Sequence, residues 1–249
     1  MASTPQYRPG GVLLTVTTVL MGSFIALTVI SIGSDALEWR LLSEIESGPE
    51  PTPERIEASD LRQAAIGFVY TGLYLVLAIA YLRSLYVLNR NARALGADDM
   101  STSPGWTVGW FFVPIASLFK PFQAVRDLWK ASVPTAGRWQ ENRSSPIVGW
   151  WWAFYLISAF FGQATFRTSL SAETIDQFQI ASGVSIAGGL FDLPLSVLAI
   201  LLLRRLFSMQ EEKYARYGES SATEPACPAC GEVRQTGDFA CPVCGHAFA

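Results

Sequence analysis

"SPGWTVGWFFVPIASLFKPF" (residues 103–122) decides the fold, because its path fixes on which side of a membrane all later residues lie. The stretch is apolar and aromatic and has no charge before Lys120, but it contains Pro104, Pro114 and Pro121. Its apolar core covers only about 14 residues, which is short for a transmembrane helix. Pro114 would also remove a helical amide donor, which is costly in lipid. We therefore expect this stretch to enter the membrane and to return to the same face.

The composition indicates an integral membrane protein. Half of the 249 residues are hydrophobic and only 16% are charged, whereas soluble domains carry about 25% charged residues. A helix needs roughly 20 apolar residues to cross a membrane, and four segments meet this length. We predict an all-α membrane protein with four transmembrane helices, a re-entrant or interfacial amphipathic segment and a small C-terminal zinc ribbon. The expected parts are an N-terminus over 1–10, a membrane domain over 11–210 (spans about 11–33, 63–82, 147–166 and 183–203, interfacial segment 104–131), a linker over 211–225 and the zinc ribbon over 226–249.

The end of the opening stretch has the pattern of a helix lying in the headgroup plane. Apolar residues recur at helical spacing and face a polar, basic side. Pro121 suits the first turn of such a helix. The apolar positions are Ile115, Leu118, Phe119, Phe122, Val125 and Trp129.

Charge predicts the orientation. Eight of the 21 acidic residues lie between residues 34 and 60, and eight of the 18 basic residues lie between 83 and 143. The positive-inside rule then places both termini in the cytoplasm and the protein in the cell (inner) membrane. The basic residues form an expected inner collar, for which topology and headgroup contact are the main interpretation and a dedicated lipid or phosphate site the alternative. Its members are Arg83, Arg90, Arg93, Lys120, Arg126 and Lys130.

Residues 91–132 resemble the signature region of a bacterial membrane family known as domain of unknown function 4328. The resemblance is carried by a long motif that includes Pro104, Gly105, Trp106, Gly109, Trp110, Pro114 and Pro121. It implies a multi-pass membrane domain over roughly residues 10–210, and it implies no activity.

All four cysteines lie in "CPACGEVRQTGDFACPVCG", as Cys227, Cys230, Cys241 and Cys244. Two C-x2-C pairs at this spacing indicate a small zinc ribbon, and the metal would supply the folding energy of so short a tail. Disulfides, a redox-active pair or rubredoxin-like iron are alternatives, although a cytosolic tail would lie in a reducing compartment. His246 is interpreted as a surface residue, because four thiolates complete the metal shell.

Asp192 is the one acidic residue well inside a predicted span, and such residues are functional hypotheses by default. Helical rise places Gln163, Thr71 and Ser23 at the same depth, which predicts one polar layer that could bind a cation or a proton. The alternative is that "FDLP" starts a shorter helix, with Asp192 as its N-cap and Pro194 in its first turn.

The leading functional hypothesis is a non-enzymatic membrane protein whose cytosolic zinc ribbon acts in protein interaction or as a scaffold. The expected partners are the lipid bilayer and a protein, which includes a second copy of the chain. The alternative is a small channel or transporter that uses the Asp192 layer. An enzyme is the weakest hypothesis, because no nucleophile with an evident base is present. Nucleic acid is excluded as a partner because Arg234 is the only basic side chain from Ala226 onward apart from His246, and no small-molecule substrate is identifiable.

Overall fold

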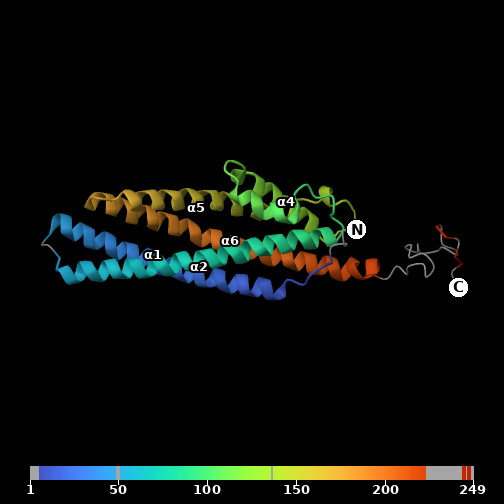
Figure 1. Ribbon diagram of the computed structural model, residues 1–249, viewed down its shortest axis with the longest axis horizontal. Helices are drawn as coiled ribbons and strands as arrows, with labels where there is room; N and C mark the ends of the chain where they lie inside the picture. Colours follow the sequence, from blue (N-terminus) through green and yellow to red (C-terminus); the bar gives the residue numbers. More distant parts are fainter. Residues whose placement is uncertain (1–5, 49–50, 136, 223–242, 245, 248–249) are drawn as a thin grey trace.

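The computed structural model describes residues 6–48, 51–135, 137–222, 243–244 and 246–247 (Figure 1). Four of the helices in this part are long and apolar enough to cross a membrane, which confirms the predicted number of such segments. They are α1 (Gly11–Ser47), α2 (Pro53–Ala94), α5 (Pro146–Ser171) and α6 (Ile175–Ala222). Between α2 and α5 lie α3 (Pro104–Gly109), α4 (Lys120–Ser132) and three 3-10 turns, η1 (Trp110–Phe112), η2 (Ala116–Leu118) and η3 (Trp139–Glu141).

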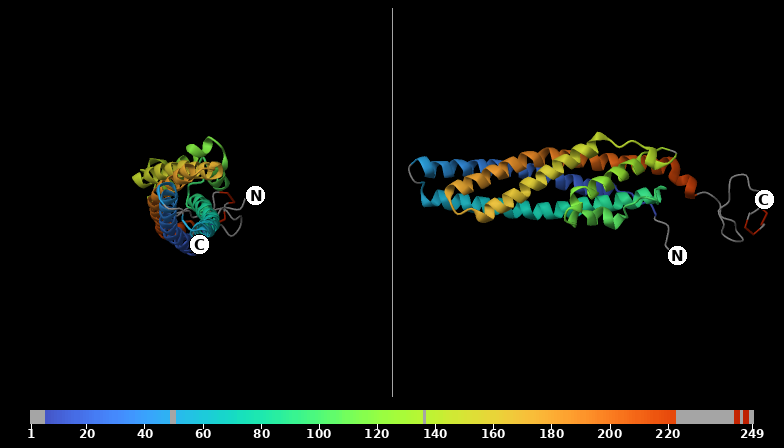
Figure 2. Two further views of the ribbon diagram at one scale, coloured as in Figure 1. Left: turned by 90° about the vertical axis from the view of Figure 1, so that its left-hand side faces the viewer. Right: turned by 90° about the horizontal axis from the view of Figure 1, so that it is seen from above.

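The four long helices form an elongated up-and-down bundle (Figures 1 and 2). In the packing order, α6 lies between α5 and α1, and α1 packs on α2. We call the end where α1 begins and α6 ends the terminal end, and the end that holds the α1–α2 connection the turn end. The segments between α2 and α5 return to the terminal end, where α3 and α4 pack on α2.

Small residues bring α6 close to α1. A Cβ atom added at Gly183 would lie 2.6 Å from the Trp39 ring, and one added at Gly189 would lie 2.8 Å from Ile32. A side chain at either position would force Trp39 or Ile32 to move, so glycine favours this close approach.

The helices extend past the predicted spans at both ends of the bundle. The acidic stretch after residue 33 continues α1 to Ser47, and α2 already begins at Pro53. The prediction of a linker from residue 211 is wrong over 211–222, because α6 continues to Ala222. The physical reason is that side chains of the extension bind other helices, as described below.

Large apolar side chains on the outer surface fit a membrane environment. Val12, Phe68 and Ile79 are 83%, 83% and 70% exposed. Water would make such a surface unfavourable over two long helices, whereas lipid would not.

Candidate functional site

Helix α4 packs on the bundle through its apolar face. Val125, Leu128 and Trp129 are buried among α2, α5 and α6, and Pro121 lies in the first turn as predicted. The predicted apolar stripe starts at Ile115, whereas α4 begins at Lys120, so the stripe is divided into two parts. The part within α4 contacts protein rather than headgroups.

Residues 104–119, which we call the apolar segment, are held on the end of α2. Pro104 opens α3, and the Ser103 hydroxyl accepts a hydrogen bond from the Trp106 amide. Thr107 is fully buried, and its hydroxyl accepts a hydrogen bond of 2.8 Å from the Asn89 side chain of α2. These contacts fix the start of the apolar segment on α2.

Beyond α3 the apolar segment turns back toward α4. A Cβ atom at Gly109 would lie 3.1 Å from the Trp106 ring, so glycine here permits Trp106 and Trp110 to approach with ring centroids 4.5 Å apart. Ile115 has a φ of 66°, which L residues with branched side chains rarely adopt. This strained turn follows Pro114, which ends the helical path.

Aromatic contacts give the depth of the apolar segment along the bundle. The Phe111 ring packs edge-on against Tyr155 of α5, with centroids 5.8 Å apart. Tyr155 lies about 12 Å along the helix from residue 147, the first residue of the third predicted span. Phe111 therefore reaches alongside the predicted membrane-spanning part of α5.

The basic residues of the expected collar have different environments. The Arg93 guanidinium donates hydrogen bonds to the carbonyl oxygens of Asp98, Met100 and Thr102 at 2.6, 2.6 and 3.0 Å, so it holds the turn after α2. It is therefore not available as a headgroup contact. Arg83 and Lys120 instead lie near the faces of Tyr86 and Trp110, at 5.4 and 5.7 Å from the ring centroids.

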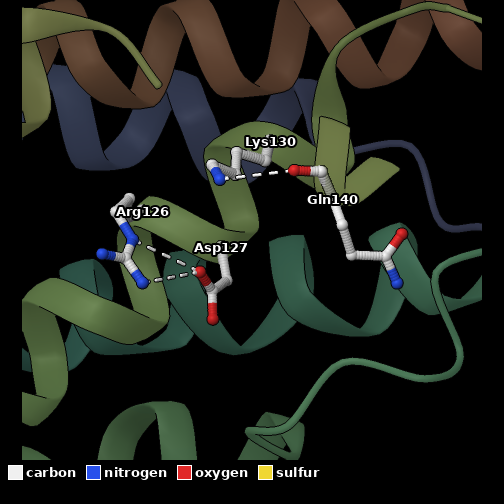
Figure 3. Close-up of polar contacts among 4 residues, drawn as sticks. All are labelled: Arg126, Asp127, Lys130 and Gln140. Carbon is white, nitrogen blue, oxygen red and sulfur yellow. Dashed lines mark hydrogen bonds and ion pairs between the residues drawn. The ribbon is translucent and has the colours of Figure 1, made fainter. Parts of the chain in front are cut away.

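Figure 3 shows two further collar residues with partners on the protein. Arg126 forms an ion pair of 3.4 Å with its neighbour Asp127, and Lys130 Nζ donates to the Gln140 carbonyl at 3.4 Å. The six predicted collar residues are thus near one end of the bundle, but they do not share one environment. Arg90 is half-buried on α2.

The extension of α6 is bound to α4. Gln210 is fully buried, and its Nε2 donates to the Leu88 carbonyl at 2.9 Å and to the Ser132 hydroxyl at 3.0 Å. Lys213, which is 8% exposed, donates to the Ala131 carbonyl at 2.9 Å. The contacts to Ser132 and Ala131 fall at the carboxyl end of α4, where helix carbonyls lack intrahelical partners and a cation is favoured.

The N-terminal segment binds to the end of α2 and to the same extension of α6. The Arg8 amide and carbonyl bond to both polar atoms of the Asn91 side chain, at 3.0 and 2.8 Å. The Tyr7 ring stacks on Tyr214 of α6 with centroids 4.3 Å apart. Burial is the main reason that the pKa of Tyr7 rises to about 12. The terminal end is therefore closed by residues from four parts of the chain.

The predicted polar layer around Asp192 does not form. The side chains of Gln163, Thr71 and Ser23 are exposed on the outside of the bundle. Asp192 instead accepts a hydrogen bond of 3.1 Å from the Tyr70 hydroxyl of α2. On α2, helical rise placed the partner within one residue but did not give the direction around the helix, since Tyr70 and Thr71 differ by about 100°.

The N-cap alternative for Asp192 is also wrong. Helix α6 runs without interruption from Ile175 to Ala222, and Pro194 lies inside it. Asp192 is thus a mid-helix carboxyl.

A polar cluster at the turn end was not predicted. Asp35 is only 8% exposed and accepts hydrogen bonds from Ser185 at 2.7 Å and Gln63 at 3.2 Å. Gln63 also donates to Glu38, and Arg62 donates to Ser34 at 2.9 Å. The cluster links α1, α2 and α6. The signal in the sequence is polar residues at helical spacing immediately after the first apolar span, at Ser34, Asp35 and Glu38.

The predicted metal ligands lie largely outside the described residues. Of the four cysteines, Cys227, Cys230 and Cys241 are outside, while Cys244 lies in an exposed turn. No group of three or more metal-ligating side chains occurs in the described part of the chain.

The bundle and its motif define the class, a four-helix protein with the features of a multi-pass membrane protein. The model of the family Domain of unknown function (DUF4328) matches residues 48–208, which is more than half of the chain. The chain belongs to this family. The match begins after α1, so both α1 and the cysteine tail lie beyond it. Neither a curated protein nor a solved structure matches the chain.

Proposed function

We propose that this protein is a non-enzymatic multi-pass membrane protein whose helical bundle anchors a C-terminal zinc ribbon at the cytoplasmic face of the inner membrane. The observation that carries the proposal is that Gly11 and the end of α6 lie at the same end of the bundle. The chain therefore enters and leaves on one side. The excess of basic residues at this end supports the cytoplasmic assignment.

The apolar segment acts as a re-entrant element in this proposal. It begins and ends at the terminal end, and Phe111 contacts Tyr155 within the expected third span. Backbone that is not helical is tolerated at membrane depth where it packs on protein. Contacts of Thr107 and Asn89 provide such packing.

The tail is the proposed interaction module. Four thiolates at C-x2-C spacing close a tetrahedral zinc site, which leaves no open position for catalysis. A structural ribbon of this kind serves a protein partner or a second copy of the chain. We therefore expect a scaffold role.

Metal analysis of the purified full-length protein tests the zinc site. We expect one zinc per chain, lost in a Cys227→Ser/Cys241→Ser double variant. His246→Ala is the matched control and should keep its zinc, because it removes an imidazole and no thiolate. A wild-type protein without metal would refute the ribbon.

A reporter fused after Ala249 tests the orientation independently. A fused fluorescent protein that folds only in the cytoplasm should be active. A fused phosphatase that works only in the periplasm should be inactive. The opposite pattern would place the terminal end outside. Cross-linking of membranes with the full chain and with a chain ending at Ala222 then tests self-association through the tail.

A second candidate function is transport of a proton or cation. It is favoured by one observation, the hydrogen bond between Asp192 and Tyr70 inside the bundle. A carboxyl at this depth is expensive unless it has a use or a partner. The test is ion flux into proteoliposomes, with Asp60→Asn as the control because it changes an exposed carboxyl. A flux that falls in Asp192→Asn but not in the control would support transport. Equal flux in both variants would refute it.

A further inference from the structure

The apolar segment presents a large apolar surface that the bundle does not cover. Phe112, Ile115 and Leu118 are 72%, 75% and 58% exposed. All three lie in or beside the turn between η1 and η2, and they precede Lys120, the first positive charge of residues 103–122. Their exposure follows from the division of the apolar stripe, since the later half of the stripe is used to attach α4.

Lys120 adds a positive charge at the edge of this surface. Its Nζ lies 5.7 Å from the centroid of the Trp110 ring, and Trp110 is in turn adjacent to Trp106. Among the residues that the structure describes, the ion pairs do not include Lys120. Arg126 and Lys130 differ, because each has a protein oxygen as its partner.

We propose that the apolar segment and Lys120 form a binding site for an anionic phospholipid of the leaflet at the terminal end. The Lys120 ammonium contacts the phosphate, and the Trp110 ring lies at the headgroup level. The exposed side chains of Phe112 and Ile115 contact the acyl chains. This inference rests on the membrane placement proposed above.

Two features favour a lipid over other anions or a protein. The site joins a cation directly to an apolar surface, which matches the amphipathic structure of a phospholipid. The apolar part is also continuous in depth with the lipid-exposed surface of the spans, because Phe111 beside it contacts Tyr155. Free phosphate would use the cation but leave the exposed apolar side chains in water.

Quenching of tryptophan by brominated phospholipids in proteoliposomes tests the site. Trp106 is 51% exposed, and its contribution is the difference between the wild type and Trp106→Phe. Brominated phosphatidylglycerol in unlabelled phosphatidylcholine is compared with the reverse labelling at the same mole fractions. We expect the anionic lipid to be enriched about fivefold at Trp106, the factor that one positive charge near an anionic surface provides.

The charge variants assign the enrichment to Lys120. Lys120→Gln should remove it, and Lys120→Arg should keep it. Lys130→Gln is the matched control, since it removes a charge on the same helix whose amine already has the Gln140 carbonyl as partner, and it should keep the enrichment.

The outcomes separate the site from the placement on which it rests. Equal quenching by both labelled lipids would overturn the anionic site and leave the placement intact. Absence of quenching by either lipid would overturn both. Loss of the enrichment on adding inorganic phosphate at millimolar concentration would show that the cation binds phosphate without the acyl contacts, and would also overturn the proposal.

Discussion

Gln210 is the most informative residue to replace, because its two amide atoms have opposite effects on stability. Its Nε2 donates to Leu88 and Ser132, whereas its Oε1 is buried and has no hydrogen-bond partner among the described residues. The side chain is also fully buried. The hydrogen bonds and the volume of this side chain can therefore be separated by substitution.

Gln210→Met keeps most of the volume and removes both polar atoms. Losing two hydrogen bonds costs about 2 kcal/mol, while removing a buried unpartnered oxygen returns about 1–3 kcal/mol. The former acceptors are not orphaned, since Ser132 Oγ still donates to the Leu128 carbonyl at 2.8 Å and the Leu88 carbonyl lies within α2. We expect the free energy of unfolding to stay within about 1 kcal/mol of the wild type.

Gln210→Ala loses the volume as well, which adds a cavity cost of about 2–5 kcal/mol. Unfolding by denaturant in mixed micelles, followed by tryptophan fluorescence, measures both variants. Glu212→Ala is the control, because its ion pair with Arg216 is exposed and contributes about 0–1 kcal/mol. If the Met variant were as unstable as the Ala variant, hydrogen bonding rather than volume would hold α6 on α4, and the reasoning would be refuted.

Two further predictions concern the N-terminal segment. Gly10→Ala would place a Cβ atom 1.9 Å from the Phe207 ring, and we expect the same unfolding assay to show a loss of about 1–3 kcal/mol; Gly11→Ala, with nothing within 4 Å of its added Cβ, should be no less stable than the wild type. Burial, followed by the negative charge of Glu211, raises the pKa of Tyr7 from 10.0 to about 12, so this group's contribution to stability is fully present below pH 10 and is lost as the pH rises toward 12. Unfolding curves over this range should fall less steeply with pH in Tyr7→Phe than in the wild type, and parallel curves would contradict the raised pKa.

The number and order of the long helices could be predicted from the sequence, because length and apolarity of a segment are local properties. The position of Pro121 in the first turn of α4 could also be predicted, since proline fits that turn and few others. Gly183 and Ala187 have the four-residue spacing of small residues that favours close helix packing, and α6 lies close to Trp39 at Gly183.

The site around Asp192 could be predicted only in depth. Rise along a helix depends on residue number alone, but the direction of a side chain depends on how each helix is rotated in the bundle. Tyr70, rather than its neighbour Thr71, faces Asp192 for this reason. No feature of one helix's own sequence fixes that rotation when apolar residues surround it on all sides.

What the apolar face of α4 packs against could not be predicted from the sequence either. An amphipathic helix buries its apolar side, but the sequence pattern does not indicate whether lipid or protein covers that side. Leu128 and Trp129 pack against the other helices of the bundle. The polar contacts of Gln210 and Lys213, which come from residues about 80 positions later in the chain, also hold α4 in this place.

These contacts also hold the part of α6 that follows the last predicted span. Residues 204–222 follow the last predicted span and are helical, so they would reach about 28 Å beyond it if the helix is straight. Gln210 and Lys213 attach the first half of this extension to α4, and Tyr7 packs on it at Tyr214. An extension held from several sides acts as a stalk rather than as a tether. The described end of α6 at Ala222 would therefore lie at a fixed distance from the predicted span, and α4 connects this extension to the motif that begins at Ser103.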